Sequence, residues 1–99
     1  MKAMNEDMIY KLHQNRAGLI NLKWTDIYDT EQELIDDMMQ LDANPDNKPM
    51  HKLVRGYEFI QSFQRRLDKG IELSDKQIVQ LKRLAPSIAY AKYIQKELR

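Results

Sequence analysis

The sequence contains no cysteine, only three glycines and three prolines, and no apolar run long enough to cross a membrane. The absence of cysteine excludes disulfide bonds and thiolate catalysis, and it removes the commonest ligands of structural zinc. A membrane-spanning helix needs roughly 20 consecutive apolar residues, and no stretch approaches that length. The N-terminus also lacks the apolar segment of a secretory signal peptide, so we expect a cytoplasmic protein.

Glycine and proline are too scarce for a protein built of strands and tight turns, which favours helices. A chain of 99 residues forms one domain by the usual size relation, and we treat residues 1–99 as a single helical domain. A domain this small buries about 60–65% of its unfolded surface, which supports one modest core. Such a core leaves little room for a deep enzyme pocket.

Motifs for catalysis and for metal binding are absent from the sequence. The two histidines, His13 and His51, have no acidic residues at the spacing of a metal site. Nothing in the sequence places the adjacent carboxylates Asp36 and Asp37 in an apolar cleft, which is what would raise a pKa for acid–base catalysis. The three glycines are far apart and form no phosphate-binding loop. We therefore expect no enzymatic activity, no cofactor and no metal ion.

Apolar residues recur at helical spacing in four or five segments, which predicts an all-α domain built as a small, compact bundle. Asn5 is a suitable N-cap for the first helix. Thr25 or Thr30 begins the second, and Thr30 with Glu33 has the spacing of a capping box. The stretch between them, residues 15–25, is compatible with a helix, a turn or a short extended segment.

The back half of the chain contains the clearest helical pattern. Apolar residues follow helical spacing over Met50–Lys69, and Gly70 suits the position just after a helix. Ser74 and Gln77 then form a second capping box, which begins another helix. We expect these two helices to pack against each other as a helical hairpin at about residues 50–84.

Two residues in this half are unusual for helices. Gly56 lies inside the first predicted helix, where glycine costs roughly 1 kcal/mol relative to alanine, and a close helix crossing would explain its presence. Pro86 breaks or kinks the next helix because its ring removes an N–H group and collides with the preceding turn. The pattern then continues to about Leu98.

Charge is distributed unevenly along the chain. Residues 1–49 carry five basic and ten acidic side chains, a net of −5, whereas residues 50–99 carry eleven basic and five acidic, a net of +6. A predicted loop over residues 42–49 separates the halves. Such an imbalance indicates either polyanion binding or charge-paired assembly, or else two halves that neutralise each other inside one fold.

The basic half is the candidate nucleic-acid-binding surface. Cations that neutralise phosphates, together with aromatic side chains that stack on bases, are typical of single-stranded nucleic-acid binding. The aromatic residues Phe59 and Phe63 are more simply explained as core, whereas Tyr90 and Tyr93 fit either reading. The candidate binding residues are Lys52, Arg55, Arg65, Arg66, Lys69, Lys76, Lys82, Arg83, Tyr90 and Lys92.

A protein partner is the alternative. Glu33, Asp36 and Asp37 form an acidic helix face through which the protein could bind a basic surface on an enzyme as an adaptor or inhibitor, although such faces are most often merely solvated. Six methionines could supply an adaptable apolar contact, and they are more simply explained as core. A homodimer that joins the acidic half of one chain to the basic half of another is a third possibility, and the sequence does not decide between monomer and dimer.

Residues 57–84 carry a pattern in which an aromatic helix leads to glycine, then to Leu-Ser-x-Lys-Gln, then to an apolar helix. The residues that carry it are Phe59, Ser62, Gly70, Leu73, Ser74, Lys76, Gln77 and Leu81. The pattern resembles the small helical accessory domain associated with UvsW-type recombination helicases of T-even-like phages. The resemblance covers 28 of the 99 residues and implies a phage replication or recombination accessory protein that contacts single-stranded DNA and a helicase.

Overall fold

The computed structural model describes residues 4–42, 52 and 54–97. All regular structure in this part of the chain is helical, as the sequence predicts. The elements in chain order are α1 (Glu6–Arg16), the short 3-10 helix η1 (Trp24–Asp26), α2 (Glu31–Met39), α4 (Tyr57–Asp68), α5 (Asp75–Arg83) and α6 (Ala85–Glu97). Most of the predicted loop over residues 42–49 lies outside the described residues.

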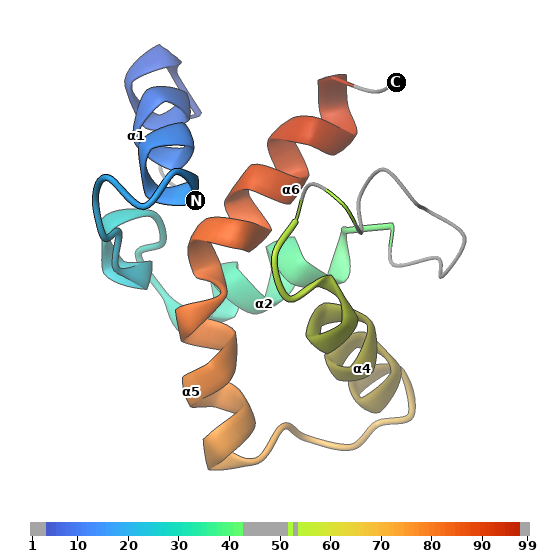
Figure 1. Ribbon diagram of the computed structural model, residues 1–99. Coiled ribbons are helices and arrows are strands. Elements are labelled where there is room, and N and C mark those ends of the chain that lie inside the picture. The colour runs from blue at the N-terminus through green and yellow to red at the C-terminus, as the bar shows by residue number, and fades with distance from the viewer. Residues whose placement is uncertain (1–3, 43–51, 53, 98–99) are drawn as a thin grey trace.

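Helix α6 is the centre of the fold. It packs against α1, α2 and α5, and Figure 1 shows it crossing the middle of the molecule. Ala85 and Ala89, one helical turn apart, are fully buried, and such small side chains let neighbouring helices approach closely. Seven of its thirteen residues are buried, so α6 is the element on which the others assemble.

The core draws side chains from each of the α-helices that the structure describes. The largest fully buried ones are Tyr28, Tyr57, Leu12, Ile27, Leu34, Met38, Ile60, Leu81 and Ile88. Each contributes about 1.5–3 kcal/mol by leaving water, so the core binds both charge halves into one unit. Met38 lies in the core and Met39 packs against it, as the simpler explanation of the methionines predicts.

Side-chain caps begin the helices where the sequence predicts them. Asn5 Oδ1 accepts a hydrogen bond from the Met8 amide at 2.9 Å. The Ser74–Gln77 capping box is complete, with bonds of 3.2 and 2.9 Å. Half of the predicted capping box at Thr30 forms, because Thr30 Oγ1 accepts a hydrogen bond from the Glu33 amide. The Glu33 carboxylate accepts from the Asp29 amide, one residue before the N-cap.

The end of α2 is capped from other helices. Gln64 Nε2 on α4 donates to the Met38 and Leu41 carbonyl oxygens, at 2.7 and 2.9 Å. Gln95 Nε2 on α6 donates to the Gln40 carbonyl oxygen at 3.3 Å. Because the last carbonyls of a helix have no partner within it, these two glutamines join α2 to α4 and α6.

The segment over residues 15–25 is a turn, a short extended stretch and then η1. Helix α1 ends at Arg16, and Gly18 follows with a φ of +77°. The chain turns back after α1, and we call this segment the return. Asn15 Oδ1 accepts a hydrogen bond from the Leu22 amide at 2.8 Å, which holds the return in place. The return positions Trp24 beside α5.

The prediction of one continuous helix over Met50–Lys69 is wrong in its first part. Val54–Gly56 form a bend and turn, and α4 begins only at Tyr57. Gly56 has a φ of +73°, and a Cβ built there would lie 2.6 Å from a Leu84 methyl carbon. The expected close approach therefore exists, but Gly56 is the N-cap and is not inside the helix. Residues 50, 51 and 53 lie outside the described residues.

The predicted helix–turn–helix is present as α4, the residue 69–74 connection and α5. Gly70 has the left-handed φ of +76° expected just after a helix. Helix α4 approaches α2 most closely, whereas α5 approaches α6, so the two helices do not form the closely packed pair that the sequence predicts and meet through the common core. Figure 1 shows the connection running from α4 to α5 along the lower side of the molecule.

Pro86 marks a break between two helices. Helix α5 ends at Arg83, Leu84 is its C-cap, and α6 begins at Ala85. Proline is tolerated in the first turn of a helix because the N–H that it lacks has no partner there. The Ile88 amide still donates to the Leu84 carbonyl at 2.9 Å, so the chain bends without losing its hydrogen bonding.

Candidate nucleic-acid interface

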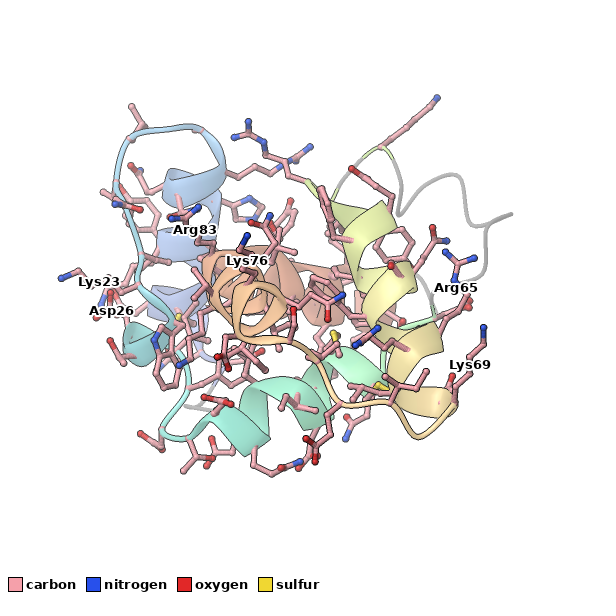
Figure 2. The ribbon with its side chains drawn as sticks, turned by 90° about the horizontal axis from the view of Figure 1, so that it is seen from below. Lys23, Asp26, Arg65, Lys69, Lys76 and Arg83 are labelled. Atoms are coloured by element: carbon pink, nitrogen blue, oxygen red, sulfur yellow. The ribbon has the colours of Figure 1, made fainter. Side chains whose placement is uncertain are left out.

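The predicted basic residues do not gather on one face. Six of them are exposed in the described structure: Lys52, Arg55, Arg65, Lys69, Lys76 and Arg83. Figure 2 shows Arg65 and Lys69 on the outer side of α4, while Lys76 and Arg83 belong to α5. The cations therefore form separate groups on α4 and α5.

Lys92 on α6 forms an ion pair with Asp37 on α2. Lys92 Nζ lies 2.9 Å from Asp37 Oδ1 and donates to Gln40 Oε1 at 2.8 Å. Asp37 is 8% exposed, so the face of α2 predicted to be solvated is partly buried against α6. Burial raises the pKa of the nearby Tyr28 hydroxyl, and the charge of Asp37 raises it further. Lys92 and Asp37 thus hold α6 to α2.

A second ion pair also joins the two charge halves. Lys82 Nζ on α5 lies 3.1 Å from Glu31 Oε2 at the start of α2. Together with the Lys92–Asp37 pair, it shows that the acidic and basic halves neutralise each other in part inside one fold. Of the other two residues of the acidic face, Asp36 is exposed and Glu33 is half-buried, and the alternative of a protein-binding surface there stays a prediction.

Two other predicted binding residues have structural contacts. Tyr90 is buried at 8% exposure. Arg66 Nε donates to the Glu72 carbonyl oxygen at 2.9 Å, which fastens the connection between α4 and α5. Of the phenylalanines expected in the core, Phe63 is buried and Phe59 is 45% exposed. Neither phenylalanine lines the groove described next.

An open groove lies between the residue 21–25 segment and α5. It has a volume of about 460 Å³ and is lined by Asn21, Leu22, Lys23, Trp24, Thr25, Val79, Lys82 and Arg83. Lys82 Nζ lies 5.0 Å from the centre of the Trp24 ring, which is cation–π distance. The groove therefore combines the protein's one indole with three cations, and we call it the Trp24 groove.

The backbone at one edge of the Trp24 groove is fixed. The Lys23 amide donates to Asp26 Oδ2 at 2.9 Å, and the Asp26 amide donates back to the Lys23 carbonyl oxygen at 3.0 Å. Trp24 is half-buried against the core, so one part of its ring is anchored and another part is accessible. Figure 2 shows Lys23 at the edge of the view opposite Arg65 and Lys69.

Sequence reasoning identified Lys82 and Arg83 but missed Lys23 and Trp24. The adjacent cation and indole are visible in the sequence as a pair, but 58 residues separate Trp24 from Lys82. Without the fold, nothing in the spacing joins them. The other predicted cations on α4 are not part of the groove.

Comparison of the chain with protein-family models, with curated proteins and with solved structures finds no match. The resemblance of residues 57–84 to a phage helicase accessory domain therefore stays a prediction. In the described part of the chain, no three acidic or histidine side chains are grouped as a metal site would need. None of the helices described there combines the length and the hydrophobicity that crossing a membrane requires.

Proposed function

We propose that this protein is a non-enzymatic accessory protein that binds single-stranded nucleic acid in the Trp24 groove. The observation that carries the proposal is the meeting of a part-exposed indole with Lys23, Lys82 and Arg83 in one open groove. Bases stack on aromatic rings whatever their identity, and cations beside the ring neutralise the backbone. The finer proposal, a role in phage replication or recombination beside a helicase, rests on the resemblance of residues 57–84 alone.

The three cations of the groove contribute unequally. Lys82 is already paired with Glu31, at 3.1 Å. Lys23 and Arg83 are exposed and form no ion pair with any residue that the structure describes. We therefore expect Lys23 and Arg83 to carry most of the phosphate binding, and Lys82 to hold the ring and the groove together.

The first experiment is titration with a single-stranded oligothymidylate, followed by the fluorescence of Trp24. Stacking of a base on the ring should quench the emission, and Trp24 is the only tryptophan that can report it. Binding should weaken with salt, with a slope of log K against log salt of about −2 if three phosphates are contacted. No binding at low salt would reject the proposal.

Paired charge reversals separate the groove from the α4 surface. Lys23→Glu with Arg83→Glu should abolish most binding, because both cations line the groove. Arg65→Glu with Lys69→Glu changes the net charge by the same amount on the opposite edge of Figure 2 and should have a small effect. Equal losses from both pairs would indicate nonspecific attraction to net charge and would contradict a defined groove.

The role of stacking is tested at Trp24 itself. Trp24→Phe keeps an aromatic face and should bind nearly as well, whereas Trp24→Leu should lose about 1–3 kcal/mol of binding free energy. A labelled oligonucleotide supplies the signal for these variants, since they have no tryptophan. Circular dichroism of both variants checks that the helices are intact, and equal affinity of the two would exclude a stacking role.

A further inference from the structure

A second cavity lies where α1, α6 and the turn before α4 meet. It has a volume of about 30 Å³, room for about two water-sized groups. Its lining residues are Leu12, Asn15, Arg16, Arg55, Pro86, Ser87 and Tyr90, and none of these is acidic. Two arginines from distant parts of the sequence thus line one small cavity.

Arg16 is held in place over a buried ring. Its Nη1 donates to the Tyr90 hydroxyl at 3.4 Å, and its Cζ lies 5.3 Å from the centre of the Tyr90 ring. His13, one turn earlier on α1, packs edge-on against the same ring at 5.2 Å. Tyr90 therefore holds the Arg16 guanidinium in place, and both residues line the cavity.

Arg55 reaches the cavity from an anchored turn. Val54 before it is 3% exposed, and Gly56 after it lies against Leu84 with a φ of +73°. Arg55 itself is exposed, and no ion pair joins it or Arg16 to a residue in the described ranges. An anion at the cavity would therefore be attracted by both positive charges.

The other polar groups at the cavity can donate hydrogen bonds. Asn15 Oδ1 is occupied by the Leu22 amide, at 2.8 Å, which directs the Nδ2 group elsewhere. Ser87 contributes a hydroxyl, and the Tyr90 hydroxyl already accepts from Arg16, which leaves its proton to donate. The cavity therefore offers one cation held by Tyr90, a second cation on the exposed Arg55, and three neutral donors.

We propose that this cavity, the Arg16–Arg55 cavity, binds a phosphate group. A phosphomonoester carries a charge of about −1.5 to −2 at neutral pH and three acceptor oxygens, which matches two guanidinium groups and several donors. A carboxylate would neutralise only one of the two cations. The cavity has room for about two of the phosphate oxygens, so the rest of the group and its ester substituent remain outside. This inference does not depend on the Trp24 groove.

The test uses small phosphates that carry no base, so that its result is independent of the Trp24 groove. Phenyl phosphate, inorganic phosphate and benzoate are titrated into the isotope-labelled full chain and followed by NMR. The expected result is saturable binding of phosphate, with the largest shifts at the side-chain N–H signals of Arg16 and Arg55 and at the Ser87 amide. The amide of Arg65, on α4, is the internal reference.

Two charge-neutral substitutions then test the arginines. Arg16→Gln and Arg55→Gln should each weaken phenyl phosphate binding by about tenfold or more, as expected for loss of a charge-assisted hydrogen bond. Arg65→Gln removes the same charge elsewhere and should change the affinity by less than about twofold. Spectra of the free variants show directly whether each is folded, and the shift map of the unaltered chain does not depend on them.

Every outcome decides the proposal. If phenyl phosphate binds more tightly than inorganic phosphate, the ligand is a phosphate ester. If inorganic phosphate binds more tightly, the ligand is free phosphate. Either result supports a phosphate site. Comparison of a 5′-phosphorylated with a 5′-hydroxyl oligonucleotide then asks whether the ester can be a nucleic-acid end. Absence of saturable phosphate binding overturns the proposal, as does equal binding of benzoate or an equal loss in Arg65→Gln.

Discussion

Removal of Lys92 should destabilise the fold because it leaves Asp37 buried without its partner. Asp37 is 8% exposed and its Oδ1 lies 2.9 Å from Lys92 Nζ. Loss of one partner costs about 3–5 kcal/mol for a fully buried pair and about 0–1 kcal/mol for an exposed one. The Lys92 side chain is 28% exposed, so we expect Lys92→Met to cost about 2 kcal/mol in the free energy of unfolding.

A matched control lies on α1. Lys11 pairs with Asp7 at 3.2 Å, but the two side chains are 48% and 70% exposed. Lys11→Met removes the same charge and should cost about 0.5 kcal/mol or less. For a domain of this size, 1 kcal/mol corresponds to about 4–8 °C in Tm, so the two variants should differ clearly in thermal unfolding.

The assay is urea unfolding followed by circular dichroism and by Trp24 fluorescence, with a double-mutant cycle. Asp37→Asn with Lys92→Met removes both charges and should be about 1–2 kcal/mol more stable than the sum of the single losses predicts. If Lys92→Met costs no more than Lys11→Met, or if the coupling is zero, the pair does not hold α6 to α2 as argued.

Three further outcomes are expected. Gly70→Ala should lower the free energy of unfolding by about 1 kcal/mol, through its positive φ alone. Gly56→Ala should lower it by at least about 2 kcal/mol, because its Cβ would also lie 2.6 Å from a leucine methyl carbon. Equal urea midpoints for the two variants would contradict this. Burial raises the pKa of Tyr57 from 10.0 to about 12, so its neutral form is favoured in the fold. The free energy of unfolding should therefore be unaffected by Tyr57 below about pH 10 and should fall as the pH rises toward 12, because the unfolded chain ionises first. Urea titrations at several alkaline pH values should show a smaller fall for Tyr57→Phe. Glu31→Gln should free Lys82 and raise oligonucleotide affinity severalfold at low salt, and an unchanged affinity would show that Lys82 takes no part in binding.

The parts of the fold that depend on local chemistry could be predicted from the sequence. The Asn5 cap and the Ser74–Gln77 box bond to amides three residues away, so short spacing identifies them. Gly56 could not be placed in this way. The apolar pattern continues through it, and its turn depends on contact with Leu84, which is 28 residues away in the chain.

The candidate site was predictable only in its residue types. The charge pattern predicted a basic binding surface, but Lys92 lies beside Asp37, 55 residues earlier in the chain, and is engaged there. Trp24 and Lys82 come together because the return after α1 carries the tryptophan to α5. Charge counts report how many cations a segment contains and cannot show which of them the fold neutralises.

The central claim is that single-stranded nucleic acid binds in the Trp24 groove, and the most direct measurement is oligothymidylate affinity at low salt for two charge-matched variants. We expect Lys23→Glu with Arg83→Glu to lose most of the affinity, and Arg65→Glu with Lys69→Glu to retain it within a few-fold. Retention of full affinity by the first variant, or equal loss by both, would contradict the account.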